Sequence, residues 1–292
     1  MMNSPSGFDW VNGKAIHIDP VKAMFNSAWT EQSIHMVLAA FVATSFAVAG
    51  MHAYMILRKG MNSFHAKAAK MALIFASVAA ILQPFSGDFS AKDIARRQPE
   101  KLAALEGLFK TSSHAELLIG GIPNIGERKV DYALRVPGAL SYLAFGNAHA
   151  EVKGLDQFPQ MDWPPIVITH IAFQIMVAAG FFLALVAVLY LIFSARWRET
   201  LTQKWWLTLV AICTPLGFLA VEAGWTVTET GRQPWIMYHI LRTRDAVSPM
   251  PGLHYSFYVI TVVYILLSLI IWWLMHRQIT TIDKFYSSAT EP

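Results

Sequence analysis

The chain has 292 residues, of which 55% are hydrophobic and only 14% are charged, and its mean hydropathy is +0.41. Because soluble domains carry about 25% charged residues, this composition indicates a membrane protein and excludes an ordinary soluble domain. The net charge of +4 comes mainly from short connections, so it does not indicate nucleic-acid binding. The single cysteine, Cys213, lies in an apolar run, which excludes an intrachain disulfide and a cysteine-ligated iron–sulfur cluster and favours a packed thiol.

Five apolar runs are long enough to cross a bilayer as helices, which takes about 20 residues. They lie at 34–57, 68–85, 166–193, 206–226 and 255–275. We therefore predict an all-α membrane helix bundle with five transmembrane helices and one large extracytoplasmic loop. The predicted divisions are an N-terminal loop segment (1–33), helices one and two (34–85), the large loop (86–164), helices three to five (165–276) and a tail (277–292).

Basic residues gather in the short connections that follow the first, third and fifth apolar runs. They are Arg58, Lys59, Lys67, Lys70, Arg196, Arg198, Lys204 and Arg277. Because positively charged loops stay on the cytoplasmic side, we predict that these connections and the C-terminus are cytoplasmic. The N-terminus and the large loop would then lie outside a plasma (inner) membrane that the chain crosses several times.

The large loop at 86–164 contains three different patterns. Residues 91–110 are charged and predict a helix, 120–126 predict a turn, and 130–143 are amphipathic without indicating one structure. Loops of this length are usually functional. Within the predicted helix, Lys101 and Glu106 taken alone indicate an ordinary solvated face.

The fourth apolar run ends in the sequence VEAGWTVTETGRQPW, residues 221–235. Its four notable residues, spaced three, four and three apart, share one helix face: Glu222, Trp225, Glu229 and Arg232. Ionisable groups in a membrane cost several kcal/mol unless something binds or pairs with them. The pattern fits a site for a buried redox cofactor. It fits equally a Glu229–Arg232 ion pair with Trp225 as an interfacial anchor.

Two further residues belong to types that can ligate haem iron. His35 lies at the outer end of the first run, and Met176 lies about two turns inside the third run. A histidine and a methionine together form a recognised low-spin haem ligation. The pairing is weak evidence by itself, because a methionine in an apolar helix usually packs. His170, one turn before Gln174, is interpreted as a satisfied polar residue that lines the bundle.

Taken together, the blocks EAGW, GRQPW, SGDF, GGIPN and FQIMV resemble subunit I of the cytochrome bd-type quinol oxidases. The resemblance implies that His35 and Met176 ligate a low-spin b haem. Gln174 stands beside that site, where the family frequently has an arginine. The resemblance also implies that Glu229 is an axial ligand of a high-spin b haem, with Arg232 balancing its charge and Trp225 assisting electron transfer between haems. Lys101 and Glu106 match residues implicated in quinol oxidation.

The activity implied by the resemblance is that of a quinol:oxygen oxidoreductase. Electrons would pass from membrane quinol to the low-spin haem, then to high-spin haems that reduce oxygen to water. The terminal haem, either haem d or a second high-spin haem, would be shared with a partner chain. The resemblance covers only the C-terminal part of the family subunit. We therefore expect a partner that supplies the first four helices, with a divergent remnant as the alternative, and a subunit II-like membrane protein.

Three other functions are compatible with parts of the sequence. A quinol-oxidising membrane cytochrome without a terminal oxygen site would share the haem ligands. A proton-coupled transporter that uses Glu222 and Glu229 would have repeats and broken helices. A cytochrome b with two bis-histidine haems would need matched spacings, but His254 and His276 are twenty-two residues apart and His35 and His52 are seventeen apart.

Overall fold

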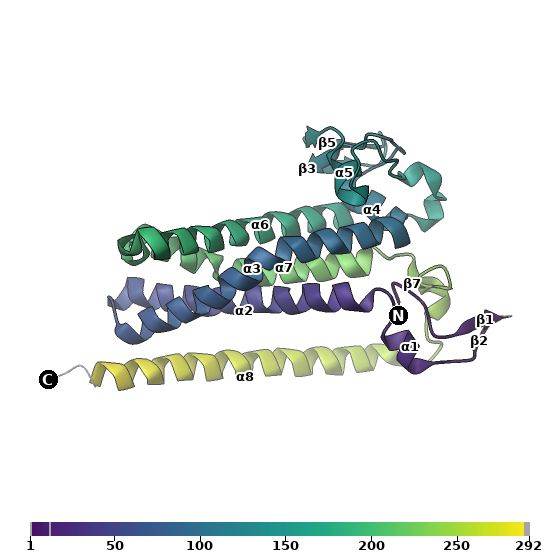
Figure 1. Cartoon of the computed structure of the whole chain (residues 1–292). Coiled ribbons are helices and arrows are strands. Elements are labelled where there is room, and N and C mark those ends of the chain that lie inside the picture. Colours follow the sequence, from purple (N-terminus) through teal and green to yellow (C-terminus); the bar gives the residue numbers. More distant parts are fainter. Residues whose placement is uncertain (1, 12, 289–292) are drawn as a thin grey trace. The chain divides into compact units, whose positions relative to one another are not determined.

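The computed structural model describes residues 2–11 and 13–288, which form two units, at 1–246 and 247–292. Four long helices build the first unit, and one long helix builds the second (Figure 1). They are α2 (Trp29–Lys59), α3 (Ser63–Arg97), α6 (Ile166–Arg196), α7 (Lys204–Thr230) and α8 (Leu253–Ser288). All five are long and apolar enough to cross a membrane, so the predicted helices and fold class are confirmed.

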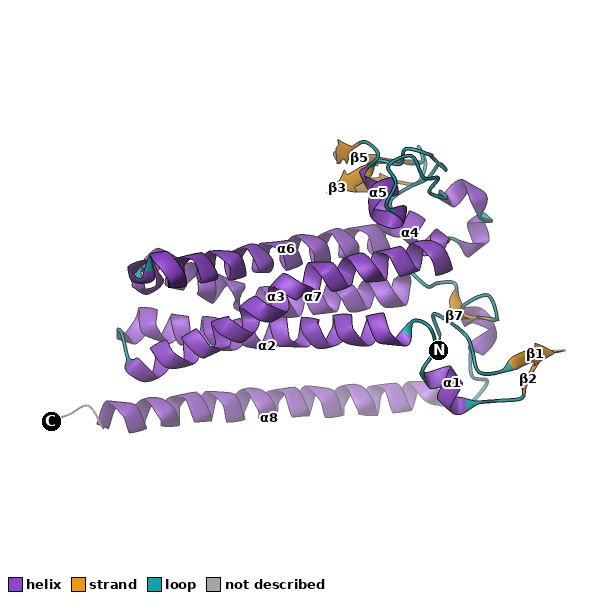
Figure 2. Ribbon diagram, in the orientation of Figure 1, coloured by secondary structure: helices purple, strands orange, loops and turns teal. Residues whose placement is uncertain are grey.

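In the first unit, α2 packs against α3 and α7, and α6 packs against the same two helices. The helices α2 and α6 therefore lie diagonally across a four-helix bundle (Figure 2). Glycines bring α2 and α7 close together, because a Cβ on Gly217 would come within 2.5 Å of Cα of Ala43. Small residues are the usual means of close helix approach in membranes.

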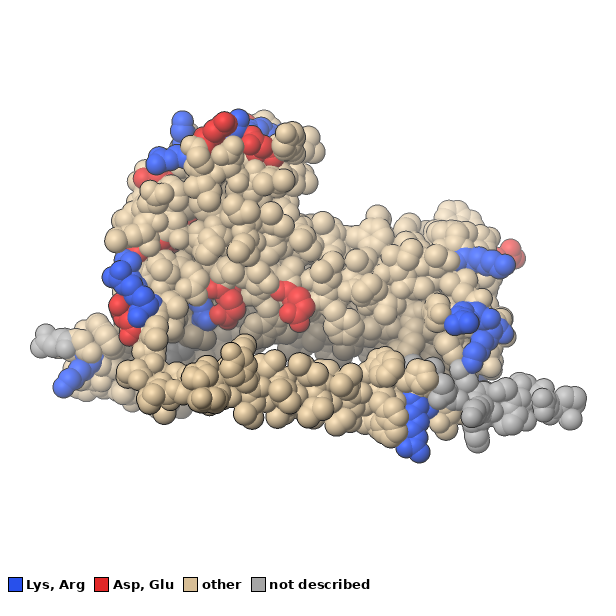
Figure 3. All heavy atoms as spheres, turned by 180° about the vertical axis from the view of Figure 1, so that it is seen from behind, with Lys and Arg blue, Asp and Glu red and all other residues tan. Residues whose placement is uncertain are grey.

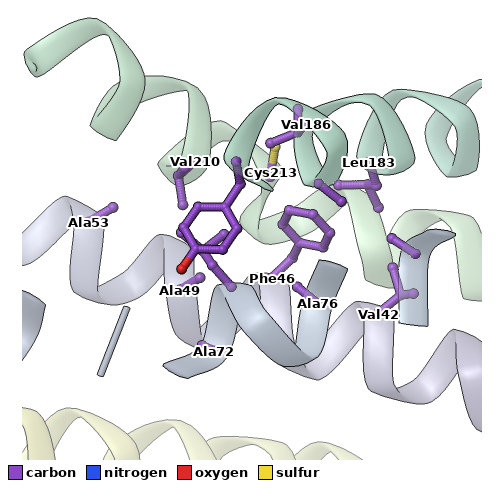
Figure 4. Close-up of a cluster of buried hydrophobic side chains, with 14 of the residues drawn as sticks. Val42, Phe46, Ala49, Ala53, Ala72, Ala76, Leu183, Val186, Val210 and Cys213 are labelled. Atoms are coloured by element: carbon purple, nitrogen blue, oxygen red, sulfur yellow. The ribbon is translucent and has the colours of Figure 1, made fainter. Parts of the chain in front are cut away.

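The bundle core is apolar and contains many alanines of α2 and α3. Phe46, Leu183 and Cys213 are fully buried in it, with Ala49 and Ala76 beside them (Figure 4). Cys213 is therefore a packed thiol, as the sequence predicts. On the face drawn in Figure 3, charged side chains gather mainly at the ends of the helices. This distribution suits a bilayer-crossing bundle.

The second membrane helix runs twelve residues beyond its expected end, from residue 85 to Arg97. Its extension is charged, and Asp88 bonds Lys92 at 2.5 Å while Asp93 pairs with Arg97, each four residues along. Pairs at this spacing stabilise a helix that is too polar for the membrane. The helix ends at Arg97 because Pro99 disfavours helical geometry in the residue before it, Gln98. Residue 85 is therefore not a structural boundary.

The segment between α3 and α6 is compact rather than an open loop. It contains α4 (Pro99–Glu106), β3 (Leu117–Ile119), β4 (Ile122–Asn124), β5 (Lys129–Asp131), β6 (Leu134–Val136), α5 (Ala139–Phe145) and two short 3-10 helices, η1 (Leu155–Gln157) and η2 (Gln160–Asp162). Strand β3 pairs with β6 and β4 with β5, both antiparallel. The predicted helix at 91–110 is thus two helices divided at Gln98, and the amphipathic stretch at 130–143 divides into strands and α5.

Two further regions differ from the sequence-based expectation. The N-terminal loop contains the hairpin of β1 (Asp9–Val11) and β2 (Lys14–Ile16), and α1 (Pro20–Met24), which Asp19 caps by accepting from two backbone N–H groups. The expected C-terminal tail is helical as far as Ser288. After α7, β7 (Trp235–Met237) pairs with β8 (Leu241–Arg242) before η4 (Thr243–Ala246), and η3 (Arg198–Thr202) joins α6 to α7.

Candidate functional site

The end of α7 carries the four-residue face that the sequence predicts. Glu222 and Trp225 are exposed, the Glu229 side chain is 46% exposed, and Arg232 lies mostly buried just beyond the helix. Arg232 donates a hydrogen bond from Nη2 to Glu229, and its Nη1 contacts Sδ of Met2 at 2.9 Å. The Glu229–Arg232 ion pair, which the sequence offers as the alternative to a cofactor site, is therefore present on this face.

The carboxylate of Glu222 has no hydrogen bond or ion pair among the described residues. It lies on an apolar face of α7 with Phe218, Leu219 and Trp225, all of which are also exposed. A carboxylate on a membrane helix is costly unless it faces a cavity, a cofactor or another protein helix. The position of Glu222 therefore indicates that a cofactor or another protein helix, rather than lipid, covers this face of α7.

The segment between α3 and α6, residues 98–165, is called the extramembrane segment below. Lys101 connects it to this end of α7. It lies in α4 and is only 4% exposed, and a Cβ on Gly231 would come within 2.9 Å of its Cε. Burial, and to a smaller extent the Arg232 guanidinium, lower the pKa of Lys101 to about 8, although the Glu229 carboxylate raises it. The structure thus joins Lys101 with Glu229 and Arg232, an association that the local sequence pattern does not reveal.

Glu106 lies in the last turn of α4 and is 5% exposed, and its Oε2 has no hydrogen-bond partner among the described residues. Burial raises the pKa of this carboxyl to about 8. Five residues separate Lys101 from Glu106, which places them about 140° apart around the helix. The interpretation of both as an ordinary solvated face is therefore wrong, because α4 is buried on every side.

His35 lies on α2 against α3, and the side chains of two α3 residues contact its ring. Nδ1 is 2.9 Å from the Ser86 hydroxyl, and the Gln83 amide nitrogen is 3.1 Å from Nε2. Gly87 leaves space beside the ring, because a Cβ there would lie 3.6 Å from Cε1 of His35. The ring is thus oriented through Nδ1, while Nε2 keeps a lone pair that the Gln83 amide contacts.

Met176 lies on α6 against α7, where a Cβ on Gly224 would come within 3.2 Å of its Sδ. The neighbouring Gln174 is bound to the extramembrane segment. Its Oε1 accepts from the N–H of Gly120 at 2.9 Å, and its Nε2 donates to the carbonyl of Leu118 at 3.0 Å. Gln174 therefore holds β3 to α6. Because both polar atoms of its amide are used in these bonds, the amide is less available to contact a haem, the role that the resemblance implies.

His170 is fully buried, and its ring contacts the extramembrane segment at both nitrogens. Nδ1 lies 2.7 Å from the carbonyl of Leu105 and Nε2 lies 3.4 Å from that of Gly120. These contacts match the interpretation of a satisfied polar residue. Together with Gln174, His170 fixes α4 and the turn at Gly120 on the N-terminal part of α6.

The residues present fit haem ligation in two places. At His35, the Ser86 contact on Nδ1 would orient the ring while Nε2 binds iron, which requires the Gln83 amide to turn away. Gly87 and Gly224 keep bulk away from His35 and Met176. At the end of α7, the half-exposed Glu229 offers an anionic oxygen ligand whose charge Arg232 balances.

Comparison with known proteins gives one consistent relationship. A model of the cytochrome bd terminal oxidase subunit I family matches residues 1–282. The putative cytochrome bd menaquinol oxidase subunit I of Bacillus subtilis (strain 168) is 39% identical over 272 residues, which are 90% of this chain and 60% of that protein. The cytochrome bd ubiquinol oxidase subunit 1 of the same organism is 31% identical over 291 residues, 95% of this chain and 62% of that protein.

A solved structure agrees with the sequence relatives. The structure of bd oxidase from Geobacillus thermodenitrificans matches with a TM-score of 0.83 and 36% identity, over 92% of this chain and 62% of that chain. The chain thus spans about three fifths of the length of the relatives that it matches. The five membrane helices, the compact segment before α6 and the extent of the match lead to one conclusion: the chain belongs to the cytochrome bd terminal oxidase subunit I family.

Proposed function

We propose that this chain is the quinol-oxidising, haem-binding part of a bd-type quinol:oxygen oxidoreductase in the plasma (inner) membrane. The observation that carries the proposal is the position of Lys101. This buried lysine of the extramembrane segment lies against Gly231, beside the Glu229–Arg232 pair at the end of a membrane helix. A residue matched to quinol oxidation and a residue matched to haem ligation therefore share one cluster.

Lys101 and Glu106 would bind and orient the quinol head group at the outer end of the bundle. Both are buried and both have a pKa near 8, so each can exchange a proton close to neutral pH. Because they project from different sides of α4, we propose that they act on different parts of the bound quinol or at different stages.

Haem, when bound, supplies the one-electron redox chemistry that links two-electron quinol oxidation to oxygen reduction. His35 and Met176 would hold the low-spin b haem, and Glu229 would hold the high-spin b haem. Trp225, exposed four residues before Glu229 on the same face, would lie on the route of electrons between them. The terminal haem, of d or b type, would be shared with protein outside this chain.

The exposed face of α7 that carries Glu222 and Trp225 supports further membrane protein in the assembly. We propose that other helices of the subunit and a subunit II-like protein cover it. With the basic connections on the cytoplasmic side, α4 and the β3–β6 region would face outward, and the C-terminus would face inward. Protons released from quinol outside would then contribute to the transmembrane potential.

The proposal is tested in the membrane complex with two electron donors, a quinol and an artificial donor that reduces haem directly. Lys101→Ala and Glu106→Ala should each lower the quinol rate by on the order of 10²-fold, while the rate with the artificial donor stays normal. The matched control is Lys110→Ala, which removes an exposed lysine from the same segment. Wild-type quinol rates in both variants would overturn the proposal.

A further inference from the structure

A second buried carboxylate, Glu100, lies beside Lys101 on α4 and belongs to none of the groups described above. Its side chain is 5% exposed, and its Oε1 accepts a 2.6 Å hydrogen bond from the Tyr238 hydroxyl. Nε2 of His239 lies 3.1 Å from the same oxygen. The other oxygen, Oε2, is buried and has no hydrogen-bond partner among the described residues. A buried acceptor without a donor is costly, so Oε2 is an atom at which a bound ligand that carries a donor would be stabilised.

Glu100 is connected to the surface through His239. The His239 side chain is 60% exposed, and its ring lies 4.1 Å from that of Tyr238, nearly parallel to it. His239 has a positive φ of 57°, a conformation that costs energy in a residue other than glycine and that fixes the turn between β7 and β8. The backbone N–H of Tyr238 also bonds the carbonyl of Met2 at 3.1 Å. The contact between a buried acid and an exposed imidazole is therefore held by the backbone.

Tyr238 acts as a fixed donor in this group. Burial raises the pKa of its hydroxyl, and the hydrogen bond to Glu100 and the carboxylate charge raise it further. The tyrosine therefore keeps its hydrogen and orients Glu100. The ionisable groups beside Glu100 are Tyr238 and His239 from the β7–β8 turn and, on its own helix, Lys101, whose side chain turns toward Gly231.

Two buried donors within seven residues of His239 also have no partner among the described residues. They are Nε of Arg232 and the indole Nε1 of Trp235. The Trp235 ring lies 5.3 Å from that of His239, and the Arg242 guanidinium is 4.7 Å from its centre. One free acceptor and two free donors near aromatic rings complement a ligand with a hydroxyl donor, oxygen acceptors and a flat ring. A quinol head group has these features.

We propose that Glu100 takes up a proton from a quinol hydroxyl at Oε2 and passes it through His239 to the outside water, with Tyr238 as the positioning residue. This inference rests on the proposed function. Oxidation breaks both O–H bonds of the quinol, and bound haem, a one-electron acceptor, would take up its two electrons in two successive steps. Each proton moves to the Glu100 carboxylate, and rotation of the carboxyl presents it to Nε2 of His239. The imidazole then releases its Nδ1 hydrogen to water, and exchange with water returns the remaining hydrogen from Nε2 to Nδ1, so that Glu100 and His239 can take up the second proton.

The test uses the membrane complex and separates proton transfer from binding and folding. Glu100→Gln keeps the shape but removes the base, so kcat for quinol should fall by on the order of 10²-fold while KM changes little. Haem content and the artificial-donor rate should match wild type. Glu151→Gln, an exposed change in the same segment, is the control. A normal kcat, or a rise in KM alone, would overturn the proposal.

A second variant remains decisive if Glu100→Gln fails to assemble. His239→Asn changes an exposed side chain, and it should lower kcat, most strongly at low buffer concentration. Added imidazole should restore at least part of the rate, since the position is open to solvent. An unchanged kcat, or a loss that imidazole does not relieve, would overturn the proposal. Failure of the wild-type complex to oxidise quinol would instead contradict the proposed function itself.

Discussion

Lys101 packs against Gly231, so that the side chain of a buried lysine from α4 crosses the residue that follows α7. A Cβ at position 231 would lie 2.9 Å from Cε of Lys101 and 2.5 Å from the carbonyl oxygen of Val227. No larger residue fits without moving the lysine or the helix end. This contact fixes α4, which carries the candidate quinol residues, relative to the Glu229–Arg232 pair.

Gly231→Ala should therefore impair quinol oxidation without removing any ionisable group. We expect the new methyl group to displace Lys101, to cost about 1–3 kcal/mol of stability and to raise KM for quinol. Gly180→Ala is the matched control, because nothing lies within 4 Å of a Cβ there and alanine favours a helix by about 1 kcal/mol. Equal quinol kinetics in the two variants would show that the Lys101–Gly231 contact has no functional role.

His35→Ala and Met176→Ala should each abolish the low-spin b haem signal and leave some high-spin haem. The reason is that each substitution removes one of the two proposed iron ligands, which lie on α2 and α6. Reduced-minus-oxidised optical spectra of the purified complex measure this. Met71→Ala, which removes an exposed methionine of α3, serves as the control. A normal low-spin α-band in both ligand variants would exclude the assignment.

Glu229→Gln should weaken or remove the high-spin b haem and stop oxygen reduction, while quinol still reduces the low-spin haem. A carboxylate is an anionic ligand that stabilises ferric iron, and the neutral amide lacks this charge. Arg232→Ala should have a milder effect, because it leaves the acid uncompensated. If the Glu229–Arg232 ion pair is purely structural, both variants should be expressed at a lower level, with unchanged haem content per folded protein. Haem stoichiometry in the two variants separates the two interpretations.

The stability of the complex should depend on the protonation of Glu106 between about pH 4.5 and 8. In this window the unfolded carboxyl is ionised, whereas burial raises the folded pKa to about 8, so wild-type stability falls as pH rises. Glu106→Gln removes this loss. The Tm of Glu106→Gln minus that of wild type should therefore increase from pH 5 to pH 8. The exposed Glu151→Gln should show no such trend, and a constant difference for Glu106→Gln would contradict its burial as a neutral acid.

Glu222→Leu tests what covers the exposed face of α7. If lipid covered Glu222, the change to leucine would raise the yield and stability and leave haem content unaltered. We expect the opposite, namely less haem per protein and weaker association with other membrane chains on detergent gel filtration. Phe218→Leu, one turn earlier on the same face, is the control for altered shape. Normal assembly of Glu222→Leu would contradict a protein or cofactor neighbour.

Local pattern was sufficient for the membrane helices and for the face of α7 that carries the candidate ligands. Twenty consecutive apolar residues identify a spanning helix without reference to the rest of the chain. Helical periodicity likewise places Glu222, Trp225 and Glu229 on one side of α7. In the described residues α3 is continuous through Pro84 and α7 through Pro215, unlike the broken helices expected for the transporter alternative.

Tertiary structure decided which charged residues are buried and what they contact. The pattern around Lys101 resembles a solvated helix, yet α3, α6 and the segments around it enclose α4 completely. Glu100 meets Tyr238 and His239 about 138 residues further along the chain. The energy of a buried charge depends on its partners in space, and local periodicity carries no information about partners so distant in sequence. The sequence by itself therefore determined the helices and the family, and only the fold brought Lys101 to Gly231.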